Sequence, residues 1–180
     1  MKITSLIIMT FFCSQVFAEQ EVTVGYGMGM DSTLIQSSSI SNANQWEASW
    51  SKKLDKSFNN DWGAWQWWLQ AGYIHLQGHQ NGMTEYLNII EVKPILRWLP
   101  GQAQKGFFLE GGLGLSSLSK KQFETIRVQT KGNFTIHFGT GWKWSDQILM
   151  SLRYSHFSNG YTHTPNPGLD TLSLNLHWSF

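Results

Sequence analysis

Residues 152–180, LRYSHFSNGYTHTPNPGLDTLSLNLHWSF, contain two alternating runs on either side of a short polar segment. In the second run every other residue is apolar, namely Leu172, Leu174, Leu176, Trp178 and Phe180. The first run alternates in the same way from Ile148 through Met150 and Leu152 to Tyr154. A repeat of two residues is typical of a β-strand with one apolar and one polar face. The stretch therefore predicts two neighbouring antiparallel strands.

The same counting places three reactive side chains on the apolar faces of these strands. His156 and Ser158 are the next two positions after Tyr154 on the face of the first run, and Asp170 precedes Leu172 on the face of the second. We therefore expect an imidazole, a hydroxyl and a carboxylate to project from one face, near the loop that joins the strands.

The first eighteen residues predict a cleavable secretory signal. Lys2 gives a positive start, an apolar segment follows, and Ala18 ends a stretch suited to signal peptidase. We expect cleavage after Ala18 and one domain over residues 19–180. Cys13 is the only cysteine and lies inside the signal, so no disulfide is expected in the mature chain.

Composition favours an all-β membrane protein. The chain has 10 Trp and only 14% charged residues, and its formal net charge of +1 gives no indication of a nucleic-acid partner. No apolar run after the signal is long enough for a transmembrane helix. Eight strands are expected over residues 21–30, 45–53, 65–76, 87–98, 106–115, 134–144, 147–158 and 170–180. We predict an eight-stranded antiparallel transmembrane β-barrel in the bacterial outer membrane, with apolar side chains toward lipid. The alternative is a soluble antiparallel barrel or sandwich.

Several details of the barrel follow from the alternation. In residues 65–76 we prefer the phase that turns Trp65, Trp67 and Tyr73 toward lipid over the one that turns Trp68 and Ile74 outward. Pro94 predicts a bulge or a local break, because proline cannot donate a ladder hydrogen bond. The inward charges are expected to pair with one another in the lumen: Glu91, Lys93, Arg97, Glu110, Lys143 and Arg153. Connections 31–44, 77–86, 116–133 and 159–169 are expected on the extracellular side.

His156, Ser158 and Asp170 are a combination suited to nucleophilic catalysis. A histidine takes the proton of a serine hydroxyl, and a carboxylate fixes the tautomer of the histidine and stabilises the imidazolium. A tetrahedral oxyanion needs nearby donors. Candidates in the same segment are Asn159, Gly160, Asn166 and Gly168.

At these residues the chain resembles the outer-membrane lipid A 3-O-deacylases (PagL), also labelled acyloxyacyl hydrolases. That family is an eight-stranded barrel with a His-x-Ser-Asn motif on its seventh strand, which matches His156, Ser158 and Asn159. The family's third catalytic residue is a glutamate fourteen residues after the histidine, where this chain has Asp170. An aspartate is one methylene shorter, so it requires a closer approach of the backbone. Asn166 matches an asparagine that the family places near the oxyanion.

The resemblance implies a serine esterase that hydrolyses the 3-O-linked acyl chain of lipid A with a triad facing the outer leaflet. Its partners would be lipopolysaccharide and outer-membrane lipid, with no metal and no organic cofactor, and a homodimer is left open. Apolar residues below the motif, such as Met150, Leu152, Tyr154 and Leu172, would line an acyl groove. Two alternatives remain: a non-enzymatic barrel serving as an adhesin or structural protein, and a lipid acyltransferase.

Overall fold

A computed structural model describes residues 19–31, 35, 38, 40, 42–80, 82–101 and 105–180. The expected signal, residues 1–18, lies outside the described residues. Among the described residues, no helix is long and apolar enough to cross a bilayer. The elements are the strands β1 (Gln20–Gly29), β2 (Ala43–Lys53), β3 (Phe58–Asn60), β4 (Gly63–Gln80), β5 (Met83–Pro100), β6 (Gly106–Leu118), β7 (Gln122–Phe123), β8 (Ile126–Arg127), β9 (Gly132–Lys143), β10 (Ile148–Ser158) and β11 (Leu169–Ser179).

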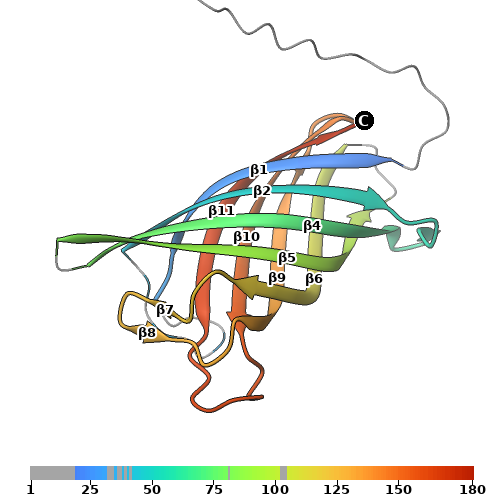
Figure 1. The fold of residues 1–180 in the computed structure, drawn as a ribbon. Helices are drawn as coiled ribbons and strands as arrows, with labels where there is room; N and C mark the ends of the chain where they lie inside the picture. Colours follow the sequence, from blue (N-terminus) through green and yellow to red (C-terminus); the bar gives the residue numbers. More distant parts are fainter. Residues whose placement is uncertain are drawn as a thin grey trace, which may run out of the picture.

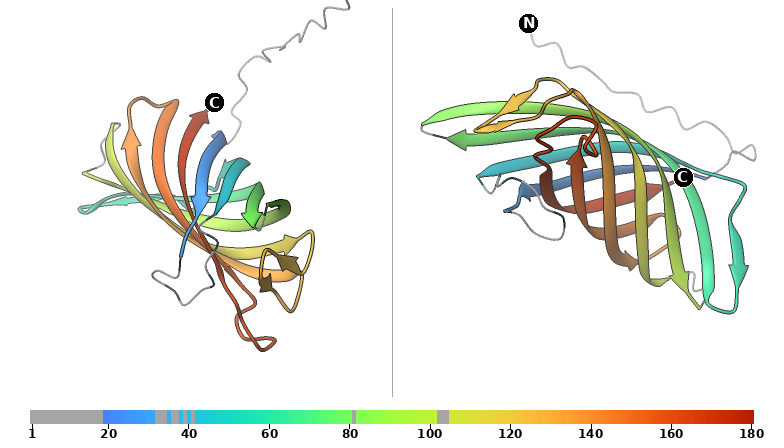
Figure 2. Two further views of the ribbon diagram at one scale, coloured as in Figure 1. Left: turned by 90° about the vertical axis from the view of Figure 1, so that its left-hand side faces the viewer. Right: turned by 90° about the horizontal axis from the view of Figure 1, so that it is seen from below.

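Eight of these strands close into an antiparallel barrel, as the sequence predicts. Their order is β2-β1-β11-β10-β9-β6-β5-β4, and a further pairing of β2 with β4 closes the ring. The views in Figures 1 and 2 show the strands curving around a common axis. The short strand β3 only extends the β4 edge, and β7 and β8 form a separate hairpin. The C-terminus and the β10–β11 connection lie at opposite ends of the barrel (Figure 1), and we call the end with this connection the distal end.

The outer wall of the barrel is mostly apolar, and most of the polar side chains of the strands point inward. In β11, Leu174, Leu176 and Trp178 are exposed, whereas Ser173 and Asn175 between them are buried. The phase preferred for β4 is confirmed, because Tyr73 is exposed on the outer wall. Trp68, Ile74 and Leu76, on the other face of β4, are buried. A wall of exposed apolar groups around a polar interior is the pattern that a bilayer requires of a barrel.

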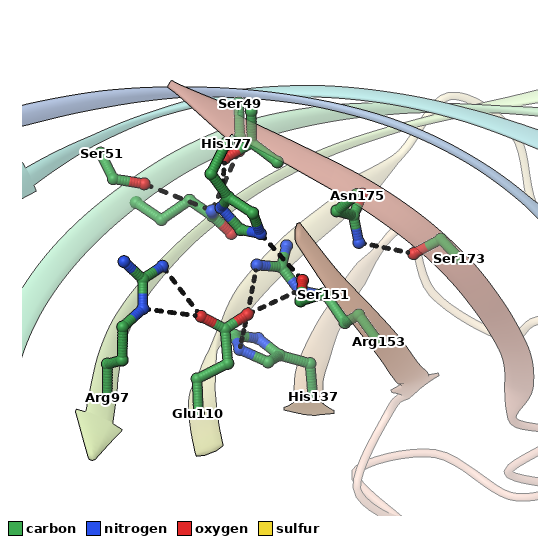
Figure 3. Close-up of polar contacts among 12 residues, drawn as sticks. Ser49, Ser51, Arg97, Glu110, His137, Ser151, Arg153, Ser173, Asn175 and His177 are labelled. Atoms are coloured by element: carbon green, nitrogen blue, oxygen red, sulfur yellow. Dashed lines mark hydrogen bonds and ion pairs between the residues drawn. The ribbon is translucent and has the colours of Figure 1, made fainter. Parts of the chain in front are cut away.

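Ion pairs fill the lumen, also as predicted. Arg97 binds Glu21 at 2.8 Å and Glu110 at 3.0 Å, and Arg153 binds Glu110 at 2.7 Å. Figure 3 shows both guanidinium groups reaching the Glu110 carboxylate from different strands. The lumen network also contains two residues that the sequence analysis did not predict. Glu47 lies 3.5 Å from Arg153, and His177 Nδ1 lies 2.9 Å from Glu21. Lys143 differs from the prediction, because it pairs with Asp146 near the C-terminal end.

Pro94 interrupts the β5–β6 ladder without shifting its register. Pairing stops at Val92, opposite Leu115, and resumes at Ile95, opposite Gly112. Two residues are skipped on each strand, so the predicted local break is confirmed and no residue is inserted as a bulge.

The distal end of the lumen is closed by an apolar cluster, which we call the plug. Inward side chains of the barrel such as Ile74, Leu87, Ile89 and Leu118 meet Phe123 and Ile126 of the β7–β8 hairpin there. β4 and β5 also run on to Gln80 and Met83. The prediction of a loop over residues 77–86 is therefore wrong, because these residues are mostly strand. They form a long hairpin that projects beyond the barrel wall (Figure 1).

Candidate active site

His156 and Asp170 form a direct pair across β10 and β11. The two residues lie directly opposite each other in the antiparallel register. His156 Nδ1 lies 2.6 Å from Asp170 Oδ1, and the Asp170 side chain is fully buried. Opposite residues of antiparallel strands have Cβ atoms roughly 4.5–5.5 Å apart. This spacing explains why an aspartate reaches the imidazole here without a longer side chain.

The hydrogen bond to Asp170 also defines the chemistry open to His156. A ring nitrogen that faces a carboxylate carries the proton in the neutral imidazole. Nδ1 is then the donor, and Nε2 is left as a base. The arrangement is that of a histidine prepared to accept a proton from a neighbouring group.

Ser158 lies two residues beyond His156 on the same face of β10. It stands opposite Phe134 of β9, an exposed outer-wall residue, so its position is on the outer face and not in the lumen. Among the described side chains no hydrogen bond joins Ser158 to His156. Catalytic hydrogen bonds often form only when substrate is bound, so position on one face is the relevant criterion here.

The three residues are on the outer face but are largely covered. His156 is 3% exposed and Ser158 8%, whereas Leu152 on the same face is 47% exposed. The β10–β11 connection folds back over this part of the wall, since a Cβ on Gly160 would lie 2.8 Å from the Phe134 ring. The predicted site is thus recessed in the outer wall and not openly exposed to lipid.

The expected oxyanion donors gather immediately after Ser158. The backbone N–H of Asn159 donates to Asn166 Oδ1 at 2.8 Å, and Asn159 Nδ2 donates to Pro165 O at 3.4 Å. Asn159 is 2% exposed, and its Oδ1 has no hydrogen-bond partner among the described residues. Asn159 and Asn166 therefore hold the loop closed beside the serine. In this arrangement the Asn159 N–H already donates to Asn166 Oδ1.

Gly168 lies on the other side of the site, just before Asp170. It is buried, and its carbonyl oxygen accepts a hydrogen bond from Ser38 N at 2.9 Å. Met30 N donates to Asp170 O at 2.9 Å. The connection between β1 and β2 thus contacts the strand that carries the carboxylate, a contribution that the sequence pattern did not reveal.

An apolar groove of about 640 Å³ lies on the outer wall below the site. Leu174 and Met150 form one side of it, and Tyr26, Trp46 and Tyr73 line it farther round the barrel. Leu174 is four residues along β11 from Asp170, which is roughly 13 Å at the rise of a β-strand. Of the expected groove residues only Met150 lines this hollow. Leu152 lies beside the groove, opposite Leu174, and Tyr154 and Leu172 lie between it and the site.

Comparisons with known proteins find relatives of this chain. The family model described as lipid A 3-O-deacylase (PagL) matches residues 20–179. The lipid A deacylase PagL of Bordetella bronchiseptica is 36% identical over 87 residues, which are 48% of this chain and 47% of that protein. The chain therefore spans about half the length of that relative. The lipid A deacylase PagL of Pseudomonas aeruginosa is 24% identical over 130 residues, 72% of this chain and 69% of that protein.

Solved structures show the same fold. The crystal structure of the outer membrane enzyme PagL superposes with a TM-score of 0.74 at 20% identity, covering 88% of this chain and 98% of that one. The N-terminal β-barrel domain of OprF from Pseudomonas aeruginosa gives a TM-score of 0.57 at 10% identity, with 92% and 100% covered. The TM-score of the PagL structure is thus higher than that of the OprF domain.

Proposed function

Because the chain belongs to the PagL family of lipid A 3-O-deacylases, we propose that it hydrolyses the 3-O-linked acyl ester of lipid A in the outer membrane. Ser158 is the nucleophile, His156 the general base, and Asp170 the residue that orients the histidine. The observation that carries this proposal is the 2.6 Å contact between His156 Nδ1 and Asp170 Oδ1 on the outer face of the barrel. Ionisable side chains are costly on a wall that faces lipid, so a buried pair of this kind indicates a role beyond contact with lipid tails.

The proposal places the distal end at the outer leaflet. Three of the four distal connections, residues 30–42, 119–131 and 159–168, are longer than those at the C-terminal end, such as 101–105 and 144–147. The fourth, residues 81–82, is short and joins the two strands of the long β4–β5 hairpin. Outer-membrane barrels have long extracellular loops and short periplasmic turns. The recess then opens at the level where ester bonds of the outer-leaflet glycolipid lie, so the substrate reaches the serine without leaving the membrane.

The reaction follows from the positions of the three groups. His156 Nε2 removes the proton of Ser158 Oγ as the oxygen attacks the ester carbonyl, and Asp170 stabilises the imidazolium that results. Donors of the Asn159–Asn166 loop stabilise the tetrahedral oxyanion. For this, either the Asn159 N–H releases Asn166 Oδ1 and donates to the oxyanion, or the Asn166 amide turns so that its NH₂ group does. The bond between the acyl carbon and the 3-oxygen of the sugar then breaks, and His156 gives its proton to that oxygen, which leaves a free 3-hydroxyl and an acyl-enzyme. Water, activated by the same histidine, releases the fatty acid.

The groove gives the acyl chain a place during this reaction. It is apolar and lies along the strands that lead away from Asp170. An acyl chain that follows Leu172 and Leu174 downward stays in contact with apolar side chains throughout. Binding energy from this remote part of the substrate positions the ester for attack.

Mass spectrometry of lipid A tests the proposal. Cells that express the wild-type protein should yield lipid A that lacks one 3-O-acyl chain, together with the matching free fatty acid. Ser158→Ala should leave lipid A intact, while the control Ser155→Ala, a serine on the opposite face of β10, should not. Intact lipid A in cells with folded wild-type protein would support the non-enzymatic reading. Loss of the chain with a newly acylated second lipid would indicate a transferase.

A further inference from the structure

The plug at the distal end of the lumen lies directly behind the candidate triad. Phe157, between His156 and Ser158 in the sequence, points inward and is 1% exposed. Leu169, which precedes Asp170, is fully buried on the same inner side. Because successive residues of a strand face opposite sides, the residues that flank an outward catalytic group necessarily point into the lumen.

Phe157 and Leu169 are also paired with each other. They stand opposite in the β10–β11 register, one step from the His156–Asp170 pair. Both belong to the cluster that contains Ile40, Phe123, Ile126 and Val128. These four residues come from the connections that cross the distal end, so the plug joins the backbone of the site to two loops that are remote in the sequence.

The first of these connections approaches the wall closely. A Cβ on Gly29 would lie 2.0 Å from Ile40 O, a separation that only glycine permits. Ile40 N donates to Met30 O at 3.1 Å, and Ile40 is fully buried. The Ile40 side chain is therefore held in the cluster by backbone contacts on the strand next to Asp170.

We propose that Phe157 and Leu169 are positioning residues. Because the plug holds their side chains in place, they restrain the backbone that carries His156, Ser158 and Asp170 on the other face. The inference rests on the proposed function, since it concerns the geometry of that triad. Close packing leaves a large buried side chain few alternative positions, so anchoring Phe157 fixes the backbone on both sides of it. A loss of this anchor lets the serine and the histidine drift relative to each other. Displacements of about 1 Å are enough to reduce turnover by ~10²-fold.

The test compares cavities at different places in the plug. Phe157→Ala opens the larger one, whereas Leu169→Ala and Ile89→Ala remove side chains of the same size and form the matched pair. Phe157→Ala removes the anchor beside the site. Ile89→Ala opens a cavity in the same cluster, but on β5, across the barrel from β10. Phe157→Leu restores an apolar anchor of nearly full size. Folding is verified by the heat-dependent gel mobility of the barrel, and each folded variant is assayed for kcat and KM on lipid A and for the rate at which a small fluorophosphonate labels the protein.

The expected result is a split between kcat and KM. Phe157→Ala should lower kcat and the labelling rate by at least ~10-fold and change KM by less than about 2-fold. Phe157→Leu should recover most of the loss, and Ile89→Ala should stay within about 2-fold of wild type. Leu169→Ala provides the same comparison beside Asp170 if Phe157→Ala does not fold.

Two results would overturn the inference in distinguishable ways. In the first, the wild-type protein cleaves lipid A, but kcat falls no further in Phe157→Ala than in Ile89→Ala. Leu169→Ala takes the place of Phe157→Ala if the latter does not fold. The plug then has a purely structural role. If folded wild-type protein neither cleaves lipid A nor reacts with the fluorophosphonate, the proposed function itself fails, and the positioning role fails with it.

Discussion

Asp170→Asn is the most informative single change at the site. It keeps the shape of the side chain and removes its charge, at a position where the side chain is 0% exposed and lies 2.6 Å from His156. If the amide oxygen faces Nδ1, a neutral hydrogen bond replaces the charge-assisted one, and only the difference between the two is lost, about 1–1.5 kcal/mol. That corresponds to a reduction of ~5- to 13-fold in kcat at about 1.36 kcal/mol for each factor of ten.

The amide has a second orientation with a larger effect. If its NH₂ group faces Nδ1, the histidine must accept there and carry its proton on Nε2, so it is no longer a base for Ser158. A triad held in the wrong tautomer loses about 10⁴-fold in kcat in the serine protease for which it has been worked out. We therefore expect kcat to fall between these limits, with the barrel still folded.

The assay for Asp170→Asn measures initial rates of fatty-acid release from lipid A in mixed micelles, at matched amounts of folded protein. Asp146→Asn is the control, because Asp146 has the same chemistry but is 74% exposed at the other end of the barrel. A loss of less than about 3-fold in kcat, below the smallest effect expected from losing the charge, would refute the role assigned to Asp170.

Two further predictions concern parts of the molecule outside the triad. Arg97→Ala leaves Glu21 and Glu110 buried without their shared partner, so we expect a loss of about 3–5 kcal/mol in stability, seen as unfolding at lower denaturant, with turnover per folded molecule maintained. An unchanged midpoint would show that the lumen pairs are redundant. In the β7–β8 turn, burial and the nearby Glu85 carboxylate raise the pKa of Glu124, while His79 opposes them. The folded turn thus binds the proton more tightly than the open turn, and its stability falls as pH rises from the ordinary carboxyl pKa through the raised one. Hydrogen exchange of residues 122–127, corrected for the intrinsic effect of pH, should show this loss of protection in the wild-type protein but not in Glu124→Gln. An identical pH dependence of exchange in the two proteins would contradict the role of Glu124.

Alternation along the strands predicted the barrel and the face on which His156, Ser158 and Asp170 lie. Successive side chains of a strand face opposite sides whatever the loops do, so counting by two from Leu172 or Tyr154 was enough to place Asp170 and His156 on the outer face. A hairpin also brings the loop-proximal ends of its two strands together, so the sequence placed His156 and Asp170 on one face near the same loop. Their direct opposition depends on the register of the strands, which the long connection from Ser158 to Leu169 leaves open.

The plug was not accessible in this way. Ile74 and Leu76 are apolar and point inward, so β4 is apolar on both faces near its distal end, and alternation no longer distinguishes strand from loop. Their partners Phe123 and Ile126 belong to a hairpin of two-residue strands, too short to show a period. The recess around Ser158 was missed for a related reason, since it depends on how the connections fold back and not on strand parity.

Covalent labelling of the serine examines the central claim most directly. After treatment with a fluorophosphonate, intact-mass and peptide mass spectrometry of the folded protein should find one adduct, on Ser158. Labelling should be lost in Ser158→Ala and strongly slowed in His156→Ala. An adduct on another residue, or equally fast labelling of Ser158 in the absence of His156, would contradict an esterase triad on the outer wall of this barrel.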